Sequence, residues 1–234
     1  PEDRTASSIA VSVEGTQLGG THDVATRLNQ DPQIDYASPV LLRVVQVRAP
    51  ASNTSEYVIA AGVIPDGTDR EILGVSTAAL TPGDPYYANG SYEGDWTGQV
   101  VASEAAAELL SLDTGEELTL PRKDLNRSLQ VVNVSTGSYS TGAGPLPIVV
   151  VHQSELQAIT GATNGDPADQ ILVSTSSTGV KSQIETLYPQ TTVITKSGFA
   201  GQSLSTSSLP VAIAVTAVLT AVVVGTLFVA TMMG

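Results

Sequence analysis

The last segment of the chain is an uncharged apolar run, and it constrains the fold more than any other feature. From Val211 to Met233 the only polar side chains are four threonine hydroxyls, and each can hydrogen-bond to a carbonyl one helical turn back. These 23 residues would form a helix about 34 Å long, enough to cross a hydrocarbon core of about 30 Å. The alternative is a buried helix of a soluble protein, but a helix of this length normally carries a polar stripe. We therefore predict a transmembrane helix within 208–234, surrounded by membrane lipid.

Both ends of the chain predict that it is a fragment of a longer membrane protein. Pro1 leads directly into polar sequence, with no initiator methionine and no signal peptide. Gly234 follows the apolar run without the basic residues that usually flank a lone anchor on its cytoplasmic side. We expect an upstream signal or membrane helix to carry residues 1–207 across the cell membrane, so that they are extracytoplasmic.

The charge balance is strongly acidic. Acidic residues outnumber basic ones 23 to 10, which gives a formal net charge of −13. Acidic, lysine-poor surfaces are typical of proteins that work in concentrated salt, where carboxylates are screened. We predict a halophilic, haloarchaeal source, with an ordinary acidic protein as the alternative. The same balance argues against nucleic acid as a partner, because phosphates require a basic face.

Four Asn-x-Ser/Thr sequons are candidate N-glycosylation sites: Asn53, Asn89, Asn126 and Asn133. Sequons also arise by chance in a chain rich in serine and threonine. They therefore favour an extracytoplasmic surface only mildly.

Hydrophobic periodicity and turn residues predict an α+β domain. Apolar residues at helical spacing indicate helices at 23–29, 104–110 and 178–187, with Thr21 as the cap of the first and Ser103 as the cap of the second. Segments rich in β-branched residues predict strands, and residues 51–55 read as a hairpin loop between two of them. The expected strands are 9–13, 36–50, 56–65, 99–102, 116–120, 128–136, 146–151, 170–177 and 191–196.

No pattern in the sequence indicates an enzyme, a cofactor or a metal. A catalytic triad could be built from His152 with Ser154 and Glu155, or from His22 with Asp23, but residues adjacent in sequence do not give a triad its geometry. We expect both histidines to be satisfied surface or capping residues. No cysteine or metal-binding spacing accompanies them, residues 164–169 lack the spacing of a calcium loop and read as a turn, and no phosphate-binding loop is present.

An aromatic cluster lies within residues 84–96, where four of the chain's ten aromatic residues are interspersed with carboxylates. Such a cluster suits a sugar, a cation or a partner protein. The alternative, which we favour, is a long loop held down by its own rings. The candidate partner-binding residues are Tyr86, Tyr87, Tyr92 and Trp96.

The order of these segments resembles the extracytoplasmic domain of MacB/FtsX-like ABC transporter permeases. The resemblance extends over almost the whole chain and ends directly in the apolar run. Residues 65–97 match no part of the family pattern. The matching stretches are 23–40, 100–120, 129–135, 148–161, 180–195 and 209–234.

The resemblance implies a function without covalent chemistry in this chain. In that family a separate cytoplasmic ATPase drives the cycle, one membrane helix precedes the domain and three follow it, and the permease forms a dimer. We therefore expect a permease domain that transmits ATP-driven motion to cargo or to an accessory protein. The alternative is a cell-surface adhesin or envelope protein with a C-terminal membrane anchor.

The expected layout has two lobes. Residues 1–64 and 146–207 would form a membrane-proximal α+β subdomain, and residues 98–145 would form a distal α+β subdomain. The loop-rich insertion 65–97 lies between them in sequence, and the membrane helix 208–234 follows.

Overall fold

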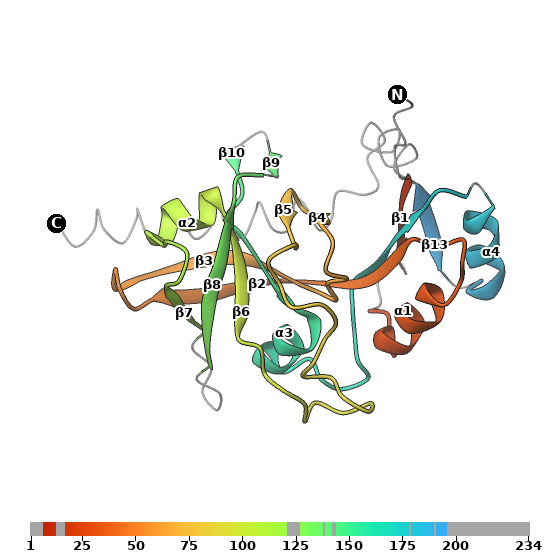
Figure 1. Cartoon of the computed structure of the whole chain (residues 1–234), viewed down its shortest axis with the longest axis horizontal. Helices are drawn as coiled ribbons and strands as arrows, with labels where there is room; N and C mark the ends of the chain where they lie inside the picture. The colour runs from red at the N-terminus through yellow and green to blue at the C-terminus, as the bar shows by residue number, and fades with distance from the viewer. Residues whose placement is uncertain are drawn as a thin grey trace, which may run out of the picture. The chain divides into compact units, whose positions relative to one another are not determined.

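The computed structural model describes residues 7–12, 17–120, 127–137, 139–141, 144–177, 179–189 and 191–195. Strands dominate, and four short helices accompany them (Figure 1). The strands are β1 (Ser7–Ser12), β2 (Tyr36–Ala49), β3 (Thr54–Val63), β4 (Glu71–Ile72), β5 (Val75–Ser76), β6 (Gln99–Ser103), β7 (Glu117–Leu120), β8 (Arg127–Ser135), β9 (Ser140–Thr141), β10 (Gly144–Pro145), β11 (Ile148–His152), β12 (Gln170–Thr175) and β13 (Thr192–Thr195). The helices are α1 (Thr21–Asn29), α2 (Glu104–Leu110), α3 (Gln153–Thr160) and α4 (Val180–Leu187).

Six strands close into a ring. The main sheet runs β13-β1-β12-β2-β3-β11-β6-β8-β7, and β7 pairs back onto β2 where Arg48 lies opposite Thr119. Within the ring β11 is parallel to β3 and β6 is parallel to β8, whereas the other neighbours are antiparallel. Closure removes the free edges that an open sheet of these strands would have.

The ring encloses the larger of two hydrophobic cores, which we call the ring core. Residues two apart on each strand point inward, as a period-two pattern requires: Val58 and Ala60, Val100 and Ala102, Leu118 and Leu120, Leu129 and Val131, and Val149 and Val151 are all buried. Helices α2 and α3 add Leu110, Leu156 and Ile159 to this core.

The second core, which we call the α1 core, lies where β13, β1, β12 and the first part of β2 meet. Helices α1 and α4 cover these strands (Figure 1). The buried apolar residues are Leu28, Ile34, Ala37, Ile171, Val173, Val180, Ile184 and Val193. Strand β2 belongs to both cores, since residues 36–40 pair with β12 and residues 41–49 pair with β3.

The predicted helices and hairpin are confirmed, with one correction. Helix α2 has the predicted bounds, and the Ser103 hydroxyl caps it by accepting from the backbone N–H of Ala106. Thr21 does not cap α1. It is the first helical residue, the cap position is Gly20, and no side chain at that position makes a cap bond.

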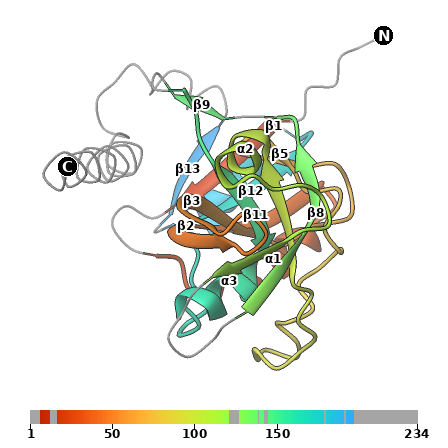
Figure 2. The same cartoon turned by 90° about the vertical axis from the view of Figure 1, so that its left-hand side faces the viewer.

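The predicted lobes are not separated by packing. Strands β3 and β11, expected in the membrane-proximal part, lie in one ring with β6 and β8, expected in the distal part, and all four share the ring core. Figure 2 shows these strands around one interior. Residues 64–98, which we call the connecting segment, contain only the two-residue strands β4 and β5, in line with the predicted loop-rich character.

The predicted membrane helix lies outside the described residues. Within the part of the chain that the structure describes, no helix is long and apolar enough to cross a membrane.

Candidate functional site

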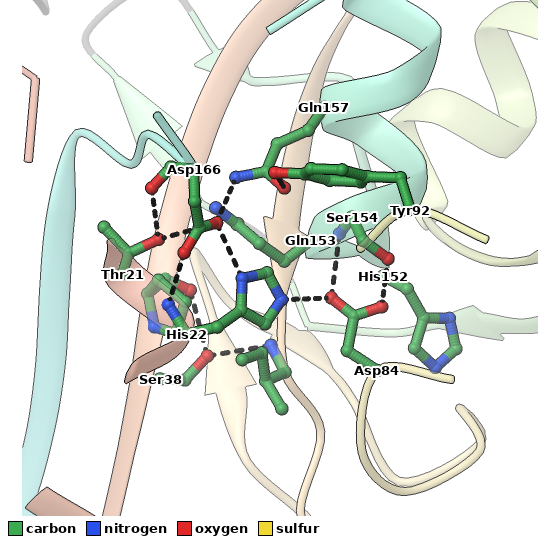
Figure 3. A network of polar contacts seen from close by, with 12 residues as sticks. Thr21, His22, Ser38, Asp84, Tyr92, His152, Gln153, Ser154, Gln157 and Asp166 are labelled. Carbon is green, nitrogen blue, oxygen red and sulfur yellow. Dashed lines mark hydrogen bonds and ion pairs between the residues drawn. The ribbon is translucent and has the colours of Figure 1, made fainter. Parts of the chain in front are cut away.

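The most concentrated polar chemistry in the described structure is a buried network around His22, a residue of helix α1 (Figure 3). Its ring lies between two carboxylates: Nδ1 is 2.6 Å from Asp166 Oδ1, and Nε2 is 3.0 Å from Asp84 Oδ2. Carboxylates accept hydrogen bonds, so both ring nitrogens are donors and the imidazole carries a proton on each. Only 6% of the His22 surface is exposed.

Asp166 fixes the start of α1 from a distant part of the chain. It lies in the loop between α3 and β12, with a positive φ of 49°. Its Oδ2 accepts from the backbone N–H of His22 at 2.7 Å, and its main-chain carbonyl accepts from the hydroxyl of Thr21 at 3.0 Å. A helix leaves its first N–H groups without partners, and a carboxylate there also suits the helix dipole. Asp166 therefore supplies the cap that Gly20 does not.

Asp84 does the same for α3. This residue of the connecting segment accepts from the backbone N–H of Ser154 at 2.8 Å and also accepts a short hydrogen bond from the Ser154 hydroxyl. The cap position of α3, His152, makes no side-chain cap bond of its own. The two carboxylates that hold His22 are thus also the capping groups of two helices, α1 and α3.

The charges of this network reinforce one another. Burial alone would lower the pKa of His22, but the hydrogen bonds and charges of Asp166 and Asp84 outweigh burial and raise the pKa to about 9. Burial would raise the pKa of Asp166, whereas its hydrogen bonds with His22 and the charge of that ring lower it overall. His22 is therefore a buried cation at neutral pH, matched by two anions.

A second buried cluster fastens the end of the connecting segment to α3. The ring of His152 is 2.8 Å from the Thr81 carbonyl through Nε2 and 2.9 Å from the Thr97 hydroxyl through Nδ1. Glu155 Oε1 accepts from the Thr97 backbone N–H at 2.5 Å and from the Gly98 N–H at 3.2 Å. Burial raises the pKa of Glu155, although these hydrogen bonds oppose the rise.

Neither cluster has the arrangement of a nucleophilic site. The Ser154 hydroxyl donates to the Asp84 carboxylate and not to a histidine, so it is not part of a serine–histidine pair. The combinations considered from sequence are wrong in detail: His22 pairs with Asp84 and Asp166 and not with Asp23, while His152 and Glu155 meet through Thr97. Among the described residues no group of acidic residues and histidines could hold a metal ion.

Both histidines are satisfied by hydrogen bonds, but neither lies at the surface, since His152 is fully buried and His22 nearly so. His152 occupies the cap position of α3 without a side-chain cap bond. Sequence reasoning missed the partners because they come from segments far apart. Residues 164–169 do form a turn, as predicted, but no local signal shows that the turn faces α1. The polar side chains of Gln153 and Gln157 on α3 are fully buried, and no local pattern in the sequence indicates this.

The aromatic cluster packs on itself and on His22. Tyr87 stacks on the His22 ring with centroids 3.9 Å apart, and it meets Tyr92 edge-on. Tyr86 meets Trp96 in a T-shaped contact, and the Tyr92 hydroxyl donates to Gln157 at 3.0 Å. All four predicted rings are partly buried. Their contacts account for a loop held down by its own rings, and their use as a partner surface stays a prediction.

The sequons differ in accessibility. Asn53 lies exposed at the tip of the β2–β3 hairpin, and Asn89 lies exposed in a turn of the connecting segment. Asn133 is half-buried within β8, and the serine of its sequon, Ser135, is buried. Asn126 lies outside the described residues, as do Val211 and Met233.

Comparison with known proteins identifies the fold. No family model matches the sequence, and no curated protein matches it. Among solved structures, the chain is similar to the periplasmic region of MacB from Actinobacillus actinomycetemcomitans, with a TM-score of 0.57 and 13% identity over 86% of this chain and 94% of that one. It is also similar to the extracellular domain of the ABC-type transporter YknZ from Gram-positive bacteria, with a TM-score of 0.50 and 14% identity over 76% of this chain and 87% of that one. The chain therefore has the mixed α/β fold of these extracytoplasmic transporter domains, in line with the predicted fold class.

Proposed function

We propose that residues 1–207 form the extracytoplasmic domain of an ABC transporter permease and transmit ATP-driven motion of the membrane helices to cargo or to an accessory protein. ATP hydrolysis would take place on a separate cytoplasmic subunit, and the permease would work as a dimer. The membrane contact would come from the apolar run that ends the sequence.

The observation that carries this proposal is the likeness to the periplasmic region of MacB, which extends over 94% of that region. Coverage of this extent means that both cores have counterparts, and not only a common supersecondary motif. The apolar run after β13 agrees with a domain that continues into a membrane helix. The haloarchaeal source stays a prediction from composition alone.

The fold suits a mechanical role better than a catalytic one. A closed ring of strands with a buried core deforms little, because packed interiors have low compressibility. The buried polar groups around His22 and His152 join segments that are far apart in the sequence. A force applied at one end of such a body would reach the other end with little loss.

The test uses the full-length gene product that contains this chain, purified from membranes with its ATPase in lipid nanodiscs. Residues 1–234 contain no cysteine, so Glu108→Cys on the exposed side of α2 provides a single spin-label site in each copy once any cysteine outside these residues has been replaced by serine. We expect an ATPase to co-purify, and the label-to-label distance across the dimer to change between the nucleotide-free and ATP-bound states. No associated ATPase, or one unchanged distance in both states, would contradict the proposal.

A further inference from the structure

The two cores are joined at a point where strand β2 changes partners. Val40 pairs with Gln170 of β12, and the next residue, Leu41, pairs with Gly62 of β3. A strand that leaves one sheet neighbour for another is a natural place for two packed bodies to turn relative to each other. Any contact that spans both bodies beside this point would limit the turn.

Such a contact exists at His22. The residue belongs to α1, whose Leu28 packs in the α1 core. Its partner Asp84 belongs to the connecting segment and is bonded to Ser154 of α3, the helix that packs into the ring core through Leu156. The chain of contacts α1–His22–Asp84–α3 therefore runs from one core to the other (Figure 3).

Asp166 provides a second connection between His22 and α3. It binds the other side of the His22 ring, and its Oδ1 also accepts from the Gln157 amide of α3 at 3.0 Å. Tyr87 covers the ring face by stacking. One charged side chain thus meets three separate segments: the connecting segment, the loop 161–169 and, through its carboxylate partners, α3.

The ion pairs of His22 with Asp84 and Asp166 are expected to form together or break together. Two buried carboxylates around one buried cation are stable as a set, whereas removal of the central charge leaves two uncompensated anions side by side. Those anions would repel each other and draw in water. An apolar contact of the same size would instead weaken gradually as the surfaces slide.

We propose that His22 is a clasp that holds the α1 core against the ring core. While its contacts with Asp84 and Asp166 are closed, the two cores move as one body; when they open, the α1 core turns about β2 near Val40 and Leu41. This inference concerns the chain itself and does not depend on the transporter assignment.

The test measures the distance between the two cores in the full chain, in detergent micelles. Thr26→Cys on the exposed face of α1 and Glu108→Cys on α2 place one spin label on each side of the joint, in a chain without other cysteines. We compare the parent double-cysteine chain with His22→Gln and with Asp84→Asn. Tyr92→Phe is the matched control, because it removes a hydrogen bond between the connecting segment and α3 and leaves the side chains of His22, Asp84 and Asp166 unchanged.

We expect a narrow distance distribution for the parent and for Tyr92→Phe, and a distribution about twice as wide or shifted for His22→Gln and Asp84→Asn. Distributions as narrow as the parent's in both clasp variants, with helical circular dichroism intact, would overturn the proposal. Equal broadening by Tyr92→Phe would also overturn it, since the effect would then be general loosening of the network.

A pH series on the parent decides the question if the clasp variants fail to fold. The titratable groups around the ring are Asp84, Asp166, Tyr87 and Tyr92, with Asp23 beside Tyr87. Among these, His22 is the group that changes charge between about pH 7 and about pH 9.5. We expect the parent distribution to broaden across this range and to recover on return. A parent distribution that stays narrow throughout the range would refute the clasp.

Discussion

The stability of the domain should fall at alkaline pH because His22 loses its proton. The raised pKa, about 9 against an ordinary value of 6.5, means that the folded state holds this proton more tightly than the unfolded chain. A group of this kind stabilises the fold fully below its unfolded pKa, and the stabilisation is lost as the pH rises through the folded pKa. The loss should therefore occur mainly between about pH 7 and about pH 9.5.

The size of the expected stability loss follows from the difference between the folded and unfolded pKa of His22. Each pKa unit corresponds to about 1.4 kcal/mol, so a shift of about 2.5 units gives roughly 3 kcal/mol between the low-pH and high-pH limits. This is a large share of a typical unfolding free energy of about 5–15 kcal/mol. The side chain is almost fully buried, so solvent screens little of the effect. Because Asp166 titrates in the same pair, its own shift describes the same interaction and is not added.

The assay is urea unfolding of residues 1–205, which contain both cores, monitored by the fluorescence of Trp96. Between about pH 6 and about pH 9.5 we expect the unfolding free energy of the wild type to fall by about 3 kcal/mol more than that of His22→Gln, which has no proton to lose there. The upper limit stays below the ordinary tyrosine range, so the rings around His22 remain protonated. Parallel pH profiles for the two proteins would show that the His22 ion pairs do not stabilise the fold.

Asp84→Asn provides an internal check on the same prediction. It leaves the shape of the site nearly unchanged but removes one of the two negative charges that raise the pKa of His22. We expect the loss of stability to end at a lower pH than in the wild type and to be smaller, since Asp166 alone holds the proton less tightly. A profile that moves to higher pH would contradict the electrostatic explanation.

Four further outcomes are expected. Ser103→Ala leaves two buried backbone N–H groups without their acceptor and should lower the unfolding free energy by about 2 kcal/mol in urea titrations. Gly62→Ala would place a Cβ 3.1 Å from the Leu156 side chain and should cost about 1–3 kcal/mol, visible as a lower melting temperature. With a net charge of −13, residues 1–205 should melt at higher temperature in about molar KCl than in dilute buffer; an equal or lower value would count against the halophilic prediction. In a glycosylating host, peptide mass spectrometry should find glycan on Asn53 and none on Asn133, and the reverse occupancy would contradict the accessibility argument.

Sequence alone predicts the local elements well because local chemistry determines them. The Ser103 cap, the first-turn glutamate and the glycine turn define α2 and its neighbours without tertiary information. The β2–β3 hairpin likewise follows from alternation and a turn-rich loop. Ring closure does not follow from any local pattern, because the contact between Arg48 and Thr119 joins strands that are distant in sequence.

The network around His22 could not be predicted for a related reason. A histidine beside an aspartate in sequence suggests that pair first, yet Asp23 points to solvent while Asp84 and Asp166 approach from 62 and 144 residues away. A usable signal was the missing cap: α1 begins at a glycine, and a helix whose cap position offers no side-chain acceptor must find one elsewhere. The same reasoning applies to α3, whose cap position is His152.

The caps connect the architecture to the proposed mechanical role. A helix capped by its own neighbour is anchored locally, whereas α1 and α3 are capped by carboxylates from other segments and so cannot shift without breaking those bonds. Because the same two carboxylates bind His22, one event at that ring releases both helix ends together. A domain that has to move as a rigid body for most of a cycle and change shape at one step requires this kind of coupling. The ring of strands supplies the rigidity, and the buried histidine supplies a place where, on the clasp proposal, the two cores can separate.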